Sequence, residues 1–264
     1  MSIDFSLLQP LGWSNHFSAQ LSLEHFDTTR PARIIGVERS LYRVDTGQEP
    51  FTTSLAGSYR HHHDKAESLP TIGDWVLLHE HDPVIVELLA RRSLIARKQA
   101  AGHDAQPIAA NINLLLIVSG LDDEFNIHRI ERYLVMAAQA DITPLVLLSK
   151  ADLCSDAEER AAMVRKHLPP HGEVFAINAL QDPLLERLGP WLMPGTTLAV
   201  VGSSGVGKST IVNNLAGYSA QSTQATRRDA KGRHTTTSRS LFRLPGGLCI
   251  IDVPGMREVG LAPT

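Results

Sequence analysis

The sequence predicts an α/β protein in two parts, a small N-terminal β-barrel and a larger three-layer domain on a mostly parallel sheet. Five short strand-like segments fall within about 65 residues of the first third of the chain. Strands then alternate with helices, and a glycine-rich turn joins a buried strand to a helix near residue 202. The chain has 264 residues, which is enough for two domains of ordinary size.

Composition limits the class of protein. Hydrophobic residues make up 43% of the chain and charged residues 20%, as in globular proteins. The net charge of -3 excludes a uniformly basic nucleic-acid binder but allows a local basic face. Cys154 and Cys249 lack metal-ligand spacing, which favours a reducing compartment. The sequence has no signal-peptide pattern and no apolar run of membrane-spanning length, so we expect a cytoplasmic protein without a membrane partner.

The first third of the sequence predicts a short N-terminal segment over residues 1–30, the lead, followed by a barrel over 31–100. Trp13 and Phe17 are expected to hold the irregular lead in place. The expected strands are 33–37, 41–44, 51–55, 73–78 and 84–89. An OB-type barrel is the common RNA-binding solution of this size, and an SH3-like barrel has much the same pattern. We expect the histidines at 61–63 to form a solvated loop, because consecutive loop side chains diverge and make a poor metal site.

Residues 101–264 predict the α/β domain, with the boundary near residue 100. Apolar runs at 113–118, 145–148, 174–177 and 197–201 are typical of strands buried on both faces. Helical periodicity covers 127–140, and a capping box at 155–158 predicts a helix to about residue 168. A further helix is expected over 183–192, and a pair of strands over 240–244 and 248–252.

The segment 202–210 matches the Walker A spacing G-x-x-x-x-G-K-S between a strand and a helix. Its glycines turn backbone N–H groups toward phosphate oxygens, and the helix N-terminus adds a positive dipole. Lys208 is expected to contact the β- and γ-phosphates and Ser209 to ligate Mg²⁺. An ordinary glycine-rich turn is the alternative, which the lysine, the serine and both flanks disfavour. The expected nucleotide-binding residues are Gly202, Ser203, Ser204, Gly205, Val206, Gly207, Lys208, Ser209 and Thr210.

A second motif, at 252–255, fits the D-x-x-G turn of GTPases. Asp252 would contact Mg²⁺ through water, and the N–H of Gly255 would approach the γ-phosphate. Alone this is a common turn, but its place at a strand end after a Walker A loop favours the functional interpretation.

A third motif, Ser149-Lys150-Ala151-Asp152, resembles the N-K-x-D guanine reader. Asp152 would pair with guanine N1 and N2, and the stem of Lys150 would lie over the base. Ser149 replaces the usual asparagine, which predicts a looser pocket with guanine specificity retained. An ordinary strand-end turn is the alternative. The pair Asn178 and Ala179 matches, more weakly, the loop whose backbone N–H meets guanine O6.

The guanine reader precedes the phosphate loop in the chain, so these motifs would form one site only in a circularly permuted domain. In these motifs, in the leader 8–13 and in K-G-R-H-T-T-T at 231–237, the chain resembles the ribosome small-subunit-dependent GTPase A family. The resemblance spans nearly the whole chain. It implies an OB-like barrel followed by a circularly permuted P-loop GTPase domain. It also implies contact with ribosomal RNA, hydrolysis of GTP to GDP stimulated by the small ribosomal subunit, and a role late in its maturation.

Family members continue into a zinc-binding domain with clustered Cys and His, and such a cluster is absent from this sequence. The chain is therefore either a shortened form or a short member, and we expect no tightly bound zinc. The bound groups expected are GTP or GDP and Mg²⁺, and we expect a monomer.

The segment 225–243 carries six basic residues against Asp229 alone, and predicts phosphate contact or a solvated charged loop. It lies at the switch I position, where Thr235, Thr236 or Thr237 would be a second Mg²⁺ ligand. Met256 follows D-x-x-G where many GTPases have a glutamine, so His234 is the candidate to orient the attacking water, unless it only contacts RNA.

A second basic set, Arg91, Arg92, Arg97 and Lys98, ends the barrel and is a candidate RNA-facing surface. Two other functions remain open from the sequence. One is a non-catalytic RNA-binding module that uses the nucleotide as a structural ligand. The other is an ATP-dependent enzyme.

Overall fold

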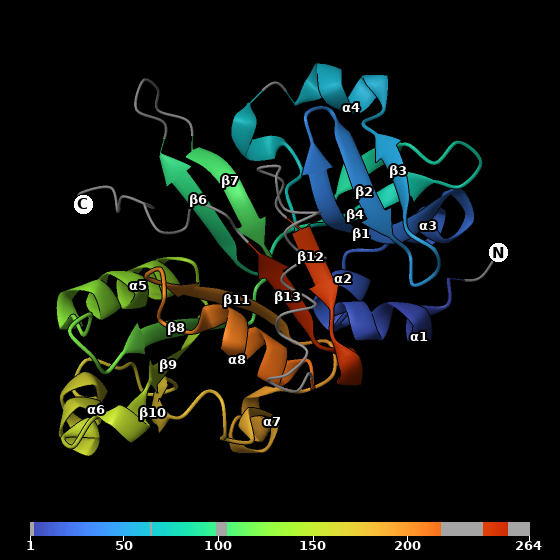
Figure 1. Ribbon diagram of the computed structural model, residues 1–264. Helices are drawn as coiled ribbons and strands as arrows, with labels where there is room; N and C mark the ends of the chain where they lie inside the picture. Colours follow the sequence, from blue (N-terminus) through green and yellow to red (C-terminus); the bar gives the residue numbers. More distant parts are fainter. Residues whose placement is uncertain (1–2, 64, 99–104, 218–239, 253–264) are drawn as a thin grey trace.

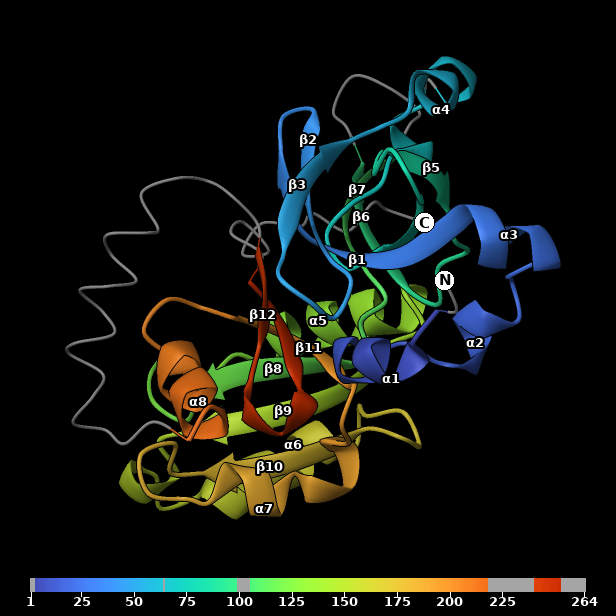
Figure 2. The same cartoon turned by 90° about the vertical axis from the view of Figure 1, so that its right-hand side faces the viewer.

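The computed structural model describes residues 3–63, 65–98, 105–217 and 240–252 (Figure 1). Within this part of the chain, one sheet of eleven strands runs through both the barrel and the α/β domain. Its order is β10-β9-β8-β11-β13-β12-β1-β2-β3, with β4 on β1 and β5 on β4. Figure 2 shows β12 and β13 extending from the α/β sheet toward the barrel. The mixed α/β class predicted from the sequence is confirmed.

The barrel has the five predicted strands. They are β1 (Thr29–Glu38), β2 (Leu41–Asp45), β3 (Phe51–Ser54), β4 (Trp75–His79) and β5 (Ile85–Leu88). Antiparallel pairing joins β3 to β2, β2 to β1, β1 to β4 and β4 to β5. A parallel bridge between Leu55 and Ile85 closes the ring, with Ala56 N donating to Ile85 O at 2.8 Å. This closed order is that of an OB-type barrel.

The lead is more regular than the sequence predicts. It forms α1 (Phe5–Leu8), η1 (Gln9–Leu11), α2 (Asn15–Ser18) and α3 (Leu23–Thr28). Trp13 and Phe17 hold it to the outside of the barrel as expected, and the ring centroids of Trp13 and Trp75 lie 4.8 Å apart. These helices are too short to be stable alone, which explains why their periodicity is weak and why this buried aromatic cluster is needed.

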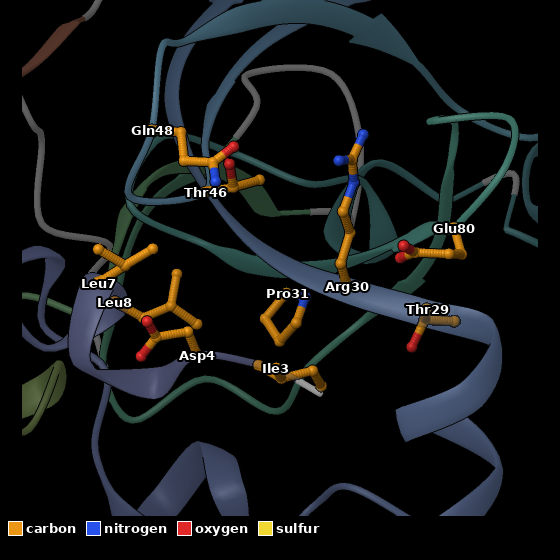
Figure 3. A pocket seen from close by; sticks show the side chains of 10 residues that line it. All are labelled: Ile3, Asp4, Leu7, Leu8, Thr29, Arg30, Pro31, Thr46, Gln48 and Glu80. Carbon is orange, nitrogen blue, oxygen red and sulfur yellow. The ribbon is translucent and has the colours of Figure 1, made fainter. Parts of the chain in front are cut away.

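A cavity of about 200 Å³ lies between the lead and the barrel (Figure 3). Leu7, Leu8 and Pro31 form part of its apolar wall, and Arg30 and Glu80 are among its polar residues. All of its lining residues belong to the lead, to the start of β1 or to barrel loops. The cavity is therefore separate from the carboxyl ends of the parallel strands.

The prediction of a solvated loop at residues 61–63 is wrong, because a helix includes His61 and His62. The barrel crossover contains α4 (Gly57–His62), followed by η2 (Ala66–Ser68). The rings of His62 and His63 contact the carbonyls of Ser58 and Tyr59 through Nδ1, at 2.7 and 3.0 Å. These contacts follow the i−4 spacing of a helix and occupy one ring nitrogen of each histidine. In the described part of the chain, no group of three or more His, Cys, Asp or Glu residues is arranged to hold a metal ion.

The α/β domain has the predicted parallel sheet. Its parallel strands are β8 (Leu114–Gly120), β9 (Thr143–Ser149), β10 (Glu173–Ile177), β11 (Thr197–Gly202) and β13 (Cys249–Asp252). They pair in the order β10-β9-β8-β11-β13, and β12 (Ser240–Arg243) adds an antiparallel strand on β13. An antiparallel strand beside parallel ones is common in α/β sheets.

Helices cover both faces of this sheet. They are α5 (Ile127–Gln139), α6 (Ala157–Arg165), α7 (Leu184–Arg187) and α8 (Lys208–Leu215). One core joins Leu115 to buried residues of α5 and α6, and a second core joins its neighbour Leu116 to α7 and α8. Because adjacent strand residues point to opposite faces, the two cores lie on opposite sides of the sheet. The predicted three layers are confirmed.

Two helix boundaries differ from the predicted ones. The N-cap of α6 is Asp156 rather than Ser155, and no side-chain cap hydrogen bond is present there. Asp156 instead accepts from Arg160 Nε at 2.9 Å. The helix expected over 183–192 divides into α7 and the 3-10 turn η4 (Gly189–Trp191), because Gly189 and Pro190 weaken a continuing helix.

The barrel and the α/β domain are connected through β1 and through a hairpin. An antiparallel bridge joins Gly36 of β1 to Ser240 of β12, beside a cavity of about 290 Å³. A hairpin of β6 (Leu94–Lys98) and β7 (Ala105–Ala110) leads from one domain to the other. The predicted boundary falls between these two strands, at residues outside the described part, and it stays a prediction.

Arg33 of β1 is a buried cation with 1% of its surface exposed. It donates to three carbonyl oxygens, those of Leu11 in the lead, Gly73 in the barrel at 3.2 Å and Asn111 after β7 at 3.1 Å. Its guanidinium also lies over the ring of Trp75, at 5.6 Å from the centroid. Burial lowers the pKa of Arg33, yet three strong acceptors keep a guanidinium charged. One side chain thus joins three segments of the chain.

Candidate functional site

The candidate site lies where the parallel strands end. Gly202 of β11 is level with Val118 of β8, and Gly120 of β8 is level with Ser149 of β9. The loops after β8, β9, β10 and β11 therefore leave the sheet along one edge, where α/β proteins bind their ligands. Asp252 ends β13 beside β11, so the phosphate loop, the guanine-reader motif and the D-x-x-G motif all start at this edge.

The phosphate loop has the conformation that its glycines predict. Gly205 and Gly207 have φ of 79° and 95°, and Gly207 is the N-cap of α8. A Cβ atom at either glycine would meet no atom within 4 Å, whereas one at Gly202 would lie 2.2 Å from Val118 O. The loop is thus fixed at its start and open at its middle. Such a concave loop at a helix N-terminus fits a phosphate group.

Lys208 begins α8, and its side chain folds back over the loop. Its Nζ donates to Gly202 O at 2.9 Å and to Ser203 O. Ser209 is exposed in the first turn of α8, and Val206 is buried against the sheet. The structure therefore brings the ammonium group and the serine hydroxyl to the same helix start. This is the arrangement that a triphosphate with Mg²⁺ requires.

Ser149 ties the candidate guanine reader to the phosphate loop. Its side chain is 1% exposed, and its Oγ donates to Val206 O at 2.6 Å and lies 3.4 Å from Ser119 O. The sequence predicted a looser pocket on the assumption that serine would not replace the inter-loop contact of asparagine. The hydroxyl makes a contact of that type, while its effect on nucleotide affinity stays a prediction.

Lys150 and Asp152 follow directly at the end of β9. Lys150 has φ of 63°, and its Nζ forms an ion pair with Asp122 in the loop after β8. This hydrogen bond is the main cause of the lowered pKa of Asp122. Asp152 lies in the turn η3 (Ala151–Leu153) with its side chain exposed. The Lys150–Asp122 pair therefore orients the reader turn while leaving Asp152 open to a ligand.

The loop after β10 is fixed by α8. Asn214 Nδ2 donates to Ala179 O at 3.1 Å and to Asp182 O at 2.9 Å. Asn178 uses its own Oδ1 in the turn, accepting from Leu180 N at 3.1 Å. The structure thus brings the weakly matching pair Asn178 and Ala179 to the same edge as the phosphate loop, and α8 sets the position of both loops.

Three residues of this edge were not found from the sequence, namely Asp122, Asn214 and Arg129. Arg129 of α5 donates to Ser203 Oγ. Asp122 follows a buried strand as Lys150 does, and that shared position is a usable signal. The contacts of Asn214 and Arg129 have no such local signal.

Several candidates lie outside the described part of the chain. They are His234, Thr235, Thr236, Thr237, Val253, Pro254, Gly255 and Met256, together with the side chain of Asp252. Their assignments stay predictions.

The second basic set is only partly free to face RNA. Arg91 forms a bidentate ion pair with buried Asp74, in which Nε and Nη2 each lie 2.8 Å from a carboxylate oxygen. It also donates to two backbone carbonyls. Arg91 is therefore structural, and its expected RNA-facing role is wrong. Arg92 and Arg97 are exposed.

A phosphate loop after β11, with a guanine-reader motif after the earlier strand β9 of the same parallel sheet, defines the class of circularly permuted GTPases. Two solved structures share this fold. The chain aligns with YjeQ from Thermotoga maritima at a TM-score of 0.65 and 20% identity, over 88% of this chain and 77% of that one. It aligns with YloQ, described as a circularly permuted GTPase, at a TM-score of 0.56 and 18% identity, over 91% and 76% of the two chains.

The chain belongs to the RsgA GTPase family, whose model matches residues 88–262. A relative from Vibrio parahaemolyticus, named small ribosomal subunit biogenesis GTPase RsgA 2, is 46% identical over 96% of this chain and 69% of its own length. A relative from Xylella fastidiosa, named small ribosomal subunit biogenesis GTPase RsgA, is 40% identical over 97% and 77%. These matches identify the chain as a GTP-hydrolysing enzyme and confirm the resemblance seen in its motifs.

Proposed function

We propose that this GTPase acts in biogenesis of the small ribosomal subunit and that the subunit stimulates its hydrolysis of GTP to GDP and phosphate. The names of the relatives from Vibrio and Xylella carry the biological role. The barrel supports it, because OB-type barrels bind oligonucleotides. It is joined to the GTPase sheet through the Gly36–Ser240 bridge. Contact of the barrel with ribosomal RNA, a monomeric state and a cytoplasmic location complete the proposal.

The site residues have separate proposed roles. The backbone at 202–207 and Lys208 would hold the phosphates, and Ser209 and one of Thr235, Thr236 and Thr237 would hold Mg²⁺, with Asp252 acting on it through water. The open space at Gly205 and Gly207 supports the phosphate assignment. Bound Mg²⁺ neutralises charge that develops on the phosphates. His234 is proposed to orient the attacking water, since the residue after D-x-x-G is Met256.

The test of this function is GTP hydrolysis with and without purified small ribosomal subunits. We expect slow basal turnover and an increase of about 10²-fold or more with subunits, because ordering a water-positioning residue contributes about 10²–10⁴-fold. Phosphate release under multiple turnover distinguishes the enzyme from a module that only binds nucleotide. Equal rates with small subunits, with large subunits and with neither would contradict the proposed partner.

Asp152→Asn is expected to change the selectivity of the base pocket from guanine to xanthine. The amide reverses one hydrogen-bond direction at the exposed end of η3, so guanine N1–H or N2–H meets a donor instead of an acceptor. We expect affinity for GTP to fall about 10²-fold and affinity for xanthosine triphosphate to rise, since a lost charged hydrogen bond costs about 1.5–3 kcal/mol.

Binding of labelled nucleotides by titration measures both effects. Asp156→Asn is the matched control, because Asp156 pairs with Arg160 at the start of α6. ATP competing with labelled GTP tests the ATP-dependent alternative. Unchanged GTP affinity in Asp152→Asn would remove Asp152 from the base pocket.

A further inference from the structure

Arg129 reaches the phosphate loop from a helix outside the nucleotide-binding motifs. It lies in the first turn of α5, where Asn126 Oδ1 accepts from the backbone N of Arg129 at 3.0 Å and caps the helix. The next residue, Ile130, is buried in the core between α5 and the sheet. The backbone of Arg129 is thus held by a cap and by packing, and its long side chain extends from this fixed point.

The guanidinium of Arg129 contacts the second residue of the loop. Its Nη1 donates to Ser203 Oγ and to Glu124 Oε2, the latter at 3.4 Å. Lys208 Nζ donates to the carbonyl oxygen of the same serine. Two cations from two helices therefore converge on Ser203, beside the open part of the loop at Gly205 and Gly207.

The two partners of Arg129 in the described part of the chain bind a guanidinium more weakly than a phosphate does. The serine hydroxyl is neutral, and the Glu124 side chain is 59% exposed, so this ion pair contributes little to stability. Arginine binds phosphate oxygens through charge-assisted and often paired hydrogen bonds, which are the stronger kind. A phosphate entering the open loop therefore competes favourably for the guanidinium.

We propose that Arg129 is a further nucleotide-contacting residue, whose guanidinium moves from Ser203 and Glu124 to the terminal phosphate of bound GTP. The proposal rests on the nucleotide role of the phosphate loop. In the reaction the water oxygen bonds to the γ-phosphorus and its proton passes to the released phosphate, while the bond to the bridging oxygen breaks and its electron pair stays on GDP. Negative charge develops on the oxygens of the transferred group and on the bridging oxygen, and a guanidinium at the terminal phosphate stabilises it from within the same chain.

The test uses the full chain without ribosomal subunits and measures dissociation constants for GDP and for the slowly hydrolysed analogue GTPγS, together with single-turnover hydrolysis of GTP. Arg129→Ala is expected to weaken GTPγS binding about 10-fold and to slow hydrolysis about 10²-fold. An arginine finger contributes about 10³–10⁵-fold, and we expect a smaller effect here because Glu124 competes for the guanidinium. GDP affinity should change less than about twofold, since GDP lacks the terminal phosphate. Arg129→Lys should restore part of the loss, because lysine keeps the charge without the paired donors.

Two further variants complete the test. Arg132→Ala removes an exposed arginine of the same helix and should behave as wild type. Glu124→Gln removes the competing carboxylate and should tighten GTPγS binding about twofold. Equal weakening of GDP and GTPγS by Arg129→Ala would show that the residue only anchors the loop, and no weakening would show that it makes no contact. Absence of turnover in the wild-type chain would instead contradict the GTPase function.

Discussion

Lys208→Ala is expected to remove nearly all GTP turnover. The ammonium group of Lys208 stands at the start of α8 and already bridges the carbonyl oxygens of Gly202 and Ser203. With nucleotide bound it would exchange these neutral acceptors for β- and γ-phosphate oxygens, where the charge that it meets increases during the reaction. Removal of one such preorganised group slows catalysis by about 10²–10³-fold, and loss of its charged hydrogen bonds weakens binding by about 1.5–3 kcal/mol.

Phosphate release and titration with a fluorescent GTP analogue measure these two losses separately. Lys166→Ala is the matched control, because Lys166 is an exposed lysine at the C-cap of α6, away from the strand ends. Thermal unfolding should be nearly unchanged in both variants. A Lys208→Ala protein that hydrolyses GTP at the wild-type rate would show that 202–210 is not the phosphate site.

Arg33→Ala is expected to lower the free energy of unfolding by about 3–5 kcal/mol. The substitution leaves a cavity and removes the donor shared by the carbonyl oxygens of Leu11, Gly73 and Asn111. Gly73 O keeps its hydrogen bond from Asn111 Nδ2 at 3.0 Å, so the carbonyls of Leu11 and Asn111 are the acceptors that lose most. A buried acceptor without a partner costs about 1–3 kcal/mol. Arg33→Met fills more of the volume yet does not restore the lost donor, so it should recover only part of the stability.

Urea unfolding followed by circular dichroism measures this effect. Arg43→Ala, on the exposed side of β2, is the control, and its effect should stay within about 0.5 kcal/mol. Trp75 lies beside Arg33, so tryptophan fluorescence, to which Trp13 and Trp191 also contribute, follows the same transition. A loss below about 1 kcal/mol in Arg33→Ala would mean that water or a shifted backbone satisfies the carbonyls of Leu11 and Asn111.

The sequence was sufficient for features with a local signal. Buried parallel strands are continuous apolar runs, and the phosphate loop needs glycines at fixed spacing, so β8, β9, β11 and the loop at 202–210 were predicted correctly. Short helices carry too few residues for a clear period, which is why the lead and α4 were expected to be irregular. The helix over 183–192 failed for a related reason, because Gly189 and Pro190 interrupt a pattern that otherwise continues.

Contacts between distant segments account for most of what the sequence missed. Lys150 and Asp122 come together only because β8 and β9 end at the same level. The role of Arg91 was misjudged because its partner, Asp74, has no sequence signal that distinguishes a buried carboxylate from an exposed one. Ser149 shows the same limit at the site, since its contact with Val206 depends on how closely two loops pack.

The position of β13 in the sheet has a consequence for the order of folding. This strand lies between β11 and β12, and β12 in turn pairs with β1, roughly 200 residues earlier in the chain. During synthesis the barrel strands β1 to β5 emerge together and can pair early, whereas the sheet that carries the phosphate loop waits for residues after 240. We therefore expect a slow final step in refolding, in which β12 and β13 insert together and complete the nucleotide-binding edge. GTP binds only the completed sheet, so its presence would shift the equilibrium of this step toward the folded state.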